Sequence, residues 1–252
     1  MIQDFGLISR YNYLVMRHKF LILLSLIWIA GCAGGNNSGQ PVTENPVPQP
    51  VERFEKQNEL PWENFGIYDA TSASRDNRKL WSNQLYNEIH TRKSSFLTRA
   101  TDAKYFCPNY DSLNERDRLN FWAQLMVQIS KWESGYNPTA RFREPRRIDK
   151  VTGKPLLSEG LFQMSHQDIM ASADCQFDWV RDSLLHPRDP RKTTYDPFLN
   201  IRCAAAIMAK QLNRTGKIVL NKRAYWAVIS RSHKNRIPQI SYFTANLPYC
   251  RR

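Results

Sequence analysis

The strongest helix signal of the sequence is SLNERDRLNFWAQLMVQISKWESGYNP, residues 112–138. Ser112 and Glu115 have the spacing of a capping box, which predicts that a helix begins there. Gly135 and Pro138 predict its end. Apolar residues recur at helical spacing and predict one buried face. This face contains Leu119, Trp122, Leu125, Met126, Ile129 and Trp132.

Further helix signals lie on both sides of this segment. From about residue 78 an apolar stripe recurs at helical spacing, and helix starts are predicted at 165–168 and at Asp196-Pro197. A fourth helix is expected over 224–229, and a small hairpin over 141–157. The stripe consists of Leu80, Trp81, Leu85, Tyr86 and Ile89. These patterns predict a mostly α fold with a small hairpin.

The N-terminal residues have the pattern of an export signal. Basic residues 17–19 precede the apolar residues 20–29, a stretch too short to span a bilayer as a helix. Ile29-Ala30-Gly31 before Cys32 resembles a bacterial lipobox. That resemblance implies cleavage before Cys32 and an acylated Cys32 that holds the protein on a bilayer. An ordinary secretory signal is the alternative, and Met16 is an alternative start of the chain.

The domain organisation follows from this signal. Residues 33–65 are rich in Gly, Asn, Pro and other polar residues, which is typical of a linker. We therefore expect a signal peptide over 1–31, Cys32 and a linker up to residue 65, and one folded domain over 66–252. Residue 33 is Ala rather than Asp, which in the lipoprotein class implies the periplasmic face of the outer membrane. A secreted or periplasmic protein is the alternative.

The composition predicts an anionic partner. The 252 residues contain 36 Lys and Arg against 23 Asp and Glu, so the net charge is +13. Basic segments lie at 141–150, 188–192 and 231–236, where they either guide an anionic substrate or form a general basic surface. Nucleic acid is not expected as a partner of a periplasmic protein. Aromatic residues make up 12% of the chain, which excludes a wholly disordered protein.

The cysteines agree with an oxidising compartment. Besides Cys32 the chain has Cys107, Cys175, Cys203 and Cys250, which predict two disulfides in one of three pairings. Cys107 and Cys250 bracket the domain, so we favour this pair together with Cys175–Cys203. Free thiols and a zinc site are the alternatives, although the chain has no CxxC pair. No metal or cofactor is expected.

Glu133 is the first candidate for chemistry. It is predicted at the C-terminal end of an apolar helix, where the helix dipole and burial both raise the pKa of a carboxyl group. A glutamic acid that stays protonated near neutral pH is what general-acid cleavage of a glycosidic bond requires. A solvent-facing glutamate at a helix end is the alternative.

Four ordered motifs resemble the soluble lytic transglycosylase and goose-type lysozyme superfamily over roughly residues 105–245. They are Glu133-Ser134 with Asn137-Pro138, Gly160-Leu161-Phe162-Gln163-Met164, Asp196-Pro197 with Asn200-Ile201, and Ala224-Tyr225. The resemblance implies a lysozyme-like domain that cleaves the bond between N-acetylmuramic acid and N-acetylglucosamine in peptidoglycan. The chain departs from the family pattern at Trp226, where Asn is common, and at Ala204, where Gly is common.

The resemblance also implies site residues. Glu133 matches the sole catalytic acid of the family. Glu159 and Asp168, near the second motif, are candidates for a second carboxylate, although solvated surface charge is the favoured interpretation of both. Side chains expected to contact the substrate are Ser134, Ser158, Phe162, Gln163, Met164 and Tyr225. For Phe162, Met164 and Tyr225 a place in the core is the alternative.

A single carboxylate favours a lytic transglycosylase. In this reaction the 6-hydroxyl of the muramic acid replaces water and gives a 1,6-anhydro end, so no second carboxylate is needed. Hydrolysis of the same bond, with deacetylated peptidoglycan as one substrate, is the first alternative. A non-catalytic wall-binding lipoprotein is the second. We expect a monomer whose partners are glycan strands and, through Cys32, a lipid bilayer.

Overall fold

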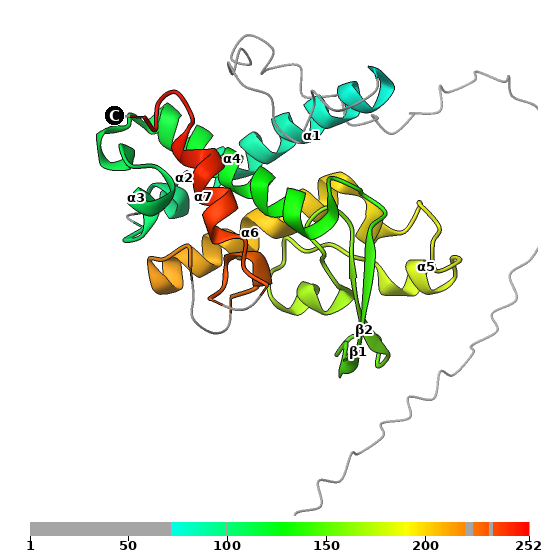
Figure 1. The fold of residues 1–252 in the computed structure, drawn as a ribbon. Coiled ribbons are helices and arrows are strands. Elements are labelled where there is room, and N and C mark those ends of the chain that lie inside the picture. The colour runs from blue at the N-terminus through cyan, green and yellow to red at the C-terminus, as the bar shows by residue number, and fades with distance from the viewer. Residues whose placement is uncertain (1–71, 99, 220–223, 232–233, 252) are drawn as a thin grey trace, which may run out of the picture. The chain divides into compact units, whose positions relative to one another are not determined.

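The computed structural model describes residues 72–98, 100–219, 224–231 and 234–251. This part of the chain is mostly helical and has one small antiparallel sheet, as expected (Figure 1). The predicted signal peptide, Cys32, the linker and the expected domain start at residue 66 lie outside the described residues. Among the described residues, no helix has the length and apolar character needed to cross a membrane.

Helix α4, Glu115–Ser134, forms the centre of the core. Residues 119–130 are all buried, so this helix is covered on every side rather than along one stripe. It packs against helix α1 (Ser72–Thr91), helix α2 (Lys93–Leu97) and helix α7 (Ile237–Ala245). Its last turn is the exception, because Trp132 is 39% exposed. The prediction that Trp132 lies in the buried face was therefore wrong.

The start of α4 also differs from the prediction. Its N-cap is Asn114, whose side chain accepts a hydrogen bond from the backbone N–H of Asp117 at 2.9 Å. Ser112 instead ends a short 3-10 helix, Tyr110–Ser112. The chain has two capping signals two residues apart, and the turn at Tyr110 selects the later one. The helix ends as predicted at Gly135, which adopts a left-handed conformation with φ of 62°.

The other helices surround this centre. Helix α6, Pro197–Thr215, begins as predicted, because Asp196 accepts hydrogen bonds from the backbone N–H groups of Phe198 and Leu199. The helix expected from about residue 78 is α1, although Leu80 is 54% exposed. The short helices are α3 (Ala103–Phe106) and α5 (Trp179–Ser183). The other 3-10 helices among the described residues are η4 (His166–Met170), η5 (Thr193–Tyr195) and η6 (Ala227–Ile229).

The helix expected over 224–229 does not form. Only the 3-10 turn η6 is present there, and Trp226 before it has an extended backbone with ψ of 128°. The buried indole N–H of Trp226 donates to the carbonyl of Phe162 at 3.0 Å. This contact with a distant segment favours the extended conformation over the local helical pattern.

A β-hairpin projects from the helices (Figure 1). Strands β1 (Arg141–Ile148) and β2 (Pro155–Glu159) pair antiparallel, which confirms the expected hairpin. Phe142 pairs with Ser158, and Glu144 pairs with Leu156. Since alternate residues of a strand face the same side, these four side chains share one face of the hairpin.

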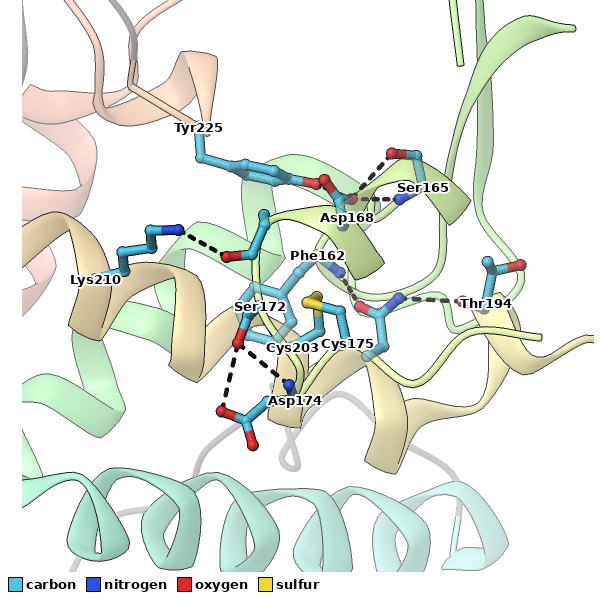
Figure 2. The surroundings of a disulfide bond; sticks show 12 residues. Phe162, Ser165, Asp168, Ser172, Asp174, Cys175, Thr194, Cys203, Lys210 and Tyr225 are labelled. Carbon is cyan, nitrogen blue, oxygen red and sulfur yellow. Dashed lines mark hydrogen bonds between the residues drawn. A yellow bond between two sulfur atoms is a disulfide. The ribbon is translucent and has the colours of Figure 1, made fainter. Parts of the chain in front are cut away.

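Two disulfides tie distant segments together, in the pairing favoured by the sequence. Cys107 joins Cys250, which links the end of α3 to the chain after α7. Cys175 joins Cys203, which links the loop after η4 to α6 (Figure 2). Both bridges are buried.

Replacing both cysteines of one bridge with serine should lower the free energy of unfolding, and more so for Cys107–Cys250. Its cysteines are 143 residues apart, against 28 for Cys175–Cys203. The chain-entropy model gives losses of about 5 and about 3.5 kcal/mol. Urea unfolding of the two double variants measures both losses. A larger loss for Cys175–Cys203 would contradict this entropic account.

Candidate active site

A groove of about 850 Å³ lies between the last turn of α4, the hairpin and the chain around η6. The hairpin contributes the face that carries Phe142, Glu144, Leu156 and Ser158. Much of the remaining lining is polar or charged. It includes Trp132, Glu133, Arg147, Gln163, Ser165, Asp168, Tyr225, Lys234 and Arg236.

Glu133 enters the groove from the last turn of α4. Burial is the main cause that raises its pKa to about 7, and repulsion from Glu144 adds to it. A hydrogen bond from the backbone N–H of Val228 and the positive charge of Lys234 act in the opposite direction. Its buried Oε1 atom has no hydrogen-bond partner. Near neutral pH this side chain therefore holds a proton that it can donate.

A second carboxylate in the groove, Glu144, was missed by the sequence analysis. Its Oε1 accepts a hydrogen bond from the hydroxyl of Ser158 at 3.2 Å, and its Oε2 pairs with the guanidinium of Arg147 at 3.0 Å. A signal was present in the sequence, since strand alternation places Phe142 and Glu144 on one face of the hairpin. Which face meets the groove depends on how the hairpin packs.

Asp168 and Tyr225 form a hydrogen-bonded pair at another wall of the groove. The Tyr225 hydroxyl donates to Asp168 Oδ2 at 2.5 Å, and Ser165 donates its backbone N–H and its hydroxyl to the same oxygen (Figure 2). Burial raises the pKa of Asp168, while these hydrogen bonds lower it. Burial and the nearby Asp168 hold the pKa of Tyr225 well above its usual range. Tyr225 is thus a neutral donor whose orientation is fixed.

The turn that carries Gln163 is fixed by α6. Gln163 has a positive φ of 54°, and its side-chain amide donates to the carbonyl of Gly160 at 3.0 Å. Asn200 of α6 accepts from the backbone N–H of Phe162 at 2.7 Å and donates to the carbonyl of Glu159 at 3.1 Å. A Cβ atom on Gly160 would lie 2.3 Å from Asn200 Nδ2, so the close approach requires glycine.

Glu159, the first candidate for a second carboxylate, lies away from the groove. It is fully buried, and its carboxylate contacts the ammonium group of Lys192 at 2.5 and 2.6 Å. The hydroxyls of Thr194 and Tyr195 donate to the same carboxylate, and Arg141 lies 3.3 Å from it. These partners satisfy Glu159 within the protein. Glu159 is therefore a buried structural charge rather than the solvated surface charge that the sequence favoured, and it is not part of the groove lining.

Three other expected contact residues also lie outside the groove lining. The Ser134 hydroxyl donates back to the carbonyl of Ser130 at 3.1 Å, within α4. Phe162 and Met164 are fully buried in the core, which was the alternative for both. The structure therefore brings together Glu133, Ser158, Gln163 and Tyr225 and leaves out Ser134, Phe162 and Met164.

The described residues contain no group of three or more His, Cys, Asp or Glu side chains placed to hold a metal ion. The buried His166, for example, pairs with an acidic side chain of the core. Its Nε2 lies 3.1 Å from Asp182, which also accepts hydrogen bonds from the backbone and hydroxyl of Thr193. This cluster connects η4 with η5 rather than lining the groove.

No family model and no curated protein matches this chain. Three solved structures of the Bdellovibrio protein Bd0314 DslA are similar to it. The wild-type protein is 24% identical, over 73% of this chain and 96% of its own, with a TM-score of 0.59. Two variants with a glutamate replaced by glutamine are 23% identical, with TM-scores of 0.60 and 0.59. They cover 75% and 73% of this chain, and 100% and 96% of their own. The similarity establishes a shared fold.

Glu159→Gln should lower the free energy of unfolding by about 3–5 kcal/mol, because it leaves Lys192 buried without a full opposite charge. The matched control is Asp111→Asn, which breaks an exposed pair with Lys104 at 2.7 Å and should cost at most about 1 kcal/mol. Urea unfolding at neutral pH measures both. Similar small losses in the two variants would show that Glu159 is not a structural anchor.

Glu133→Gln should stabilise the protein above neutral pH. The ordinary pKa of the carboxyl group is 4.5 and its folded pKa is about 7. Between these values the folded state binds more protons than the unfolded state, so the stability of the wild type falls as pH rises. The variant lacks this loss and should be more stable at pH 8 by up to about 3 kcal/mol.

The two proteins should differ little near pH 4, where Glu133 is protonated in both folded and unfolded chains. Denaturant unfolding at pH 4 and pH 8 measures the difference. A stability difference that does not change between these two pH values would disprove the raised pKa of Glu133.

Proposed function

We propose that this protein cleaves the β-1,4 bond between N-acetylmuramic acid and N-acetylglucosamine in peptidoglycan, with Glu133 as the general acid. The observation that carries the proposal is a glutamic acid with a pKa of about 7 in an open groove. A general acid acts best when its pKa lies near the working pH. Glu133 donates its proton to the glycosidic oxygen, so that the leaving sugar departs as an alcohol.

The remaining groove suits a sugar chain. Ser158, Gln163 and Tyr225 supply hydroxyl and amide groups that hydrogen-bond to sugar hydroxyls and N-acetyl groups. Trp132 and Phe142, which are 39% and 55% exposed, supply aromatic surface beside Glu133. The four motifs that resemble the lytic transglycosylase and goose-type lysozyme superfamily support the same substrate and a lysozyme-like fold.

A second carboxylate in the groove lining, Glu144, favours hydrolysis. In two-carboxylate glycosidases the second carboxylate either attacks the sugar as a nucleophile or acts as the general base that activates water. Glu144 is such a group, and we propose that it takes the proton of the attacking water while Glu133 protonates the leaving oxygen. The two glutamates replaced in Bd0314 DslA lie eleven positions apart in that protein. Glu133 and Glu144 have the same separation, which supports a paired role.

Transglycosylation is the second candidate, and the sequence motifs favour it. In this reaction the 6-hydroxyl of the muramic acid attacks the anomeric carbon, and the deprotonated Glu133 takes the proton of that hydroxyl. The bond to the leaving sugar breaks and a 1,6-anhydro ring forms, with no water consumed. Because Glu133 serves as both acid and base, Glu144 has no necessary part in this reaction.

The proposed substrate agrees with the proposed location. We propose a lipoprotein anchored through Cys32 at the periplasmic face of the outer membrane, on the strength of the lipobox-like sequence. Two disulfides support an oxidising compartment. Peptidoglycan is within reach of a domain tethered there.

Glu133→Gln should reduce the cleavage of purified sacculi by about two to four orders of magnitude, because general-acid help is lost. Glu144→Gln should cause a comparable loss if water is the acceptor and little loss if the 6-hydroxyl is. Glu115→Gln, which changes an exposed carboxylate at the start of α4, is the matched control and should retain full activity. Turbidity and the masses of the released fragments are measured together.

The fragment masses separate the two reactions, since a 1,6-anhydro end is lighter than a reducing end by one water. Reducing ends together with an inactive Glu144→Gln variant support hydrolysis. A folded Glu133→Gln variant that clears sacculi within tenfold of the wild type would refute the proposed acid. A wild-type protein that binds sacculi without releasing fragments would indicate the non-catalytic wall-binding alternative.

A further inference from the structure

Cationic side chains surround the carboxylates of the groove. Glu133 and Glu144 lie in the lining together with Lys234 and Arg236, which come from the chain after η6. Arg147 of β1 is a third cation in the lining, but it pairs with Glu144 at 3.0 Å. Lys234, which also favours the charged form of Glu133, and Arg236 enter the lining from a different segment than the two glutamates.

The structure separates these two residues from the rest of the basic surface. In the basic segment 188–192, Arg191 pairs with Asp189 at 2.7 Å and Lys192 is buried against Glu159. Arg143 and Arg146 of β1 are exposed but lie outside the groove lining. Lys234 and Arg236 are thus the part of the basic surface that lies beside the proposed site of cleavage.

Both cations are held on aromatic rings of the groove. The Lys234 ammonium lies 5.7 Å from the centre of the Phe142 ring, and the Arg236 guanidinium lies 5.2 Å from the centre of the Trp132 ring. Phe142 belongs to the hairpin and Trp132 to α4, so the two contacts lie on different walls. A ring face attracts a cation and helps to hold it in place.

We propose that Lys234 and Arg236 bind carboxylates of the substrate and make the groove selective for anionic peptidoglycan strands over neutral glycans of the same backbone. This inference rests on the proposed function. Lysine and arginine are the side chains that pair with carboxylates, and arginine does so with two parallel hydrogen bonds. A neutral polysaccharide offers no partner to either side chain.

Peptidoglycan offers such carboxylates from two sources. Stem peptides carry free carboxylates, whereas the lactyl carboxylate of muramic acid is free only where the stem peptide has been removed. The shared chemistry is a carboxylate that hangs beside a neutral sugar backbone. Lys234 and Arg236 line the same groove as Glu133, so a strand bound for cleavage would bring its pendant carboxylates near these cations.

The test measures binding in a Glu133→Gln background, which keeps the strands intact and removes the influence of Lys234 on the acid. The full chain is titrated with three strands of one length: strands with stem peptides, strands stripped by an amidase, and stem-bearing strands whose carboxylates have been converted to carboxamides. The dissociation constants of the Glu133→Gln protein are compared with those after Lys234→Gln and Arg236→Gln are added. The matched control adds Arg143→Gln and Arg146→Gln, which removes the same charge from exposed positions outside the groove.

Conversion to carboxamides should weaken binding roughly three- to tenfold, the effect of one or two partly exposed ion pairs, and added salt should reduce the difference. The Lys234 and Arg236 variant should bind charged and neutral strands alike, while the Arg143 and Arg146 variant should keep the discrimination. If stripped strands bind as tightly as stem-bearing strands, the lactyl carboxylate is sufficient for recognition. If stripped strands bind more weakly, the recognised carboxylates belong to the stem peptide.

Equal binding of charged and neutral strands by the Glu133→Gln protein would overturn the inference and leave the cleavage proposal intact. Discrimination that survives in the Lys234 and Arg236 variant would overturn it as well. Failure of every strand to bind would overturn this inference and the proposed function together, and the cleavage assay on sacculi would then show no released fragments.

Discussion

The burial of the Glu133 carboxyl group is the constraint around which the groove is organised. Helix α4 is covered on all sides along residues 119–130, so its last turn is the place where it leaves the core. A carboxyl group at this boundary loses most of its solvation, and its pKa rises to about 7. The surrounding groups adjust that value, because Val228 and Lys234 favour the charged form while Glu144 opposes it. Glu133 therefore keeps its proton near neutral pH at the edge of the groove, whereas a fully solvated glutamate would lose it.

Three acidic side chains, Glu159, Asp168 and Glu133, show how hydrogen-bond and charge partners decide the role of a buried acid. Glu159 is surrounded by Lys192, two hydroxyls and Arg141, so it is a fixed structural charge. Asp168 receives hydrogen bonds from Tyr225 and Ser165 and orients the tyrosine. Glu133 has one buried oxygen without a partner, and this is the carboxyl group that is left available for chemistry. All three residues stand in or near the sequence motifs, and the position at a helix end distinguished only Glu133.

The Asn200 side chain joins two of the sequence motifs into one structure. Its amide accepts from the Phe162 backbone and donates to the carbonyls of Glu159 and Thr194, which fixes the turn that presents Gln163. The close contact between Asn200 and Gly160 explains why this turn contains glycine. Trp226 fixes the same turn from the other side through its bond to the Phe162 carbonyl. Asn200, which is fully buried and outside the groove lining, thereby helps to determine the shape of the groove.

The sequence by itself determined the mostly α fold, the end of α4, the start of α6, the hairpin, the favoured disulfide pairing and Glu133 as the residue to follow. Each of these features depends on local periodicity, capping residues or position along the chain, and all three can be read from the sequence. The tertiary structure decided which of the predicted side chains meet. It placed Glu159, Phe162 and Met164 in the core, opened Trp132 to the groove, and replaced the helix expected over 224–229 with an extended segment that Trp226 anchors. Glu144 entered the site because the hairpin turns one of its two faces toward α4. Strand alternation predicts which residues share a face, but only packing against the rest of the chain selects the face that lines the groove.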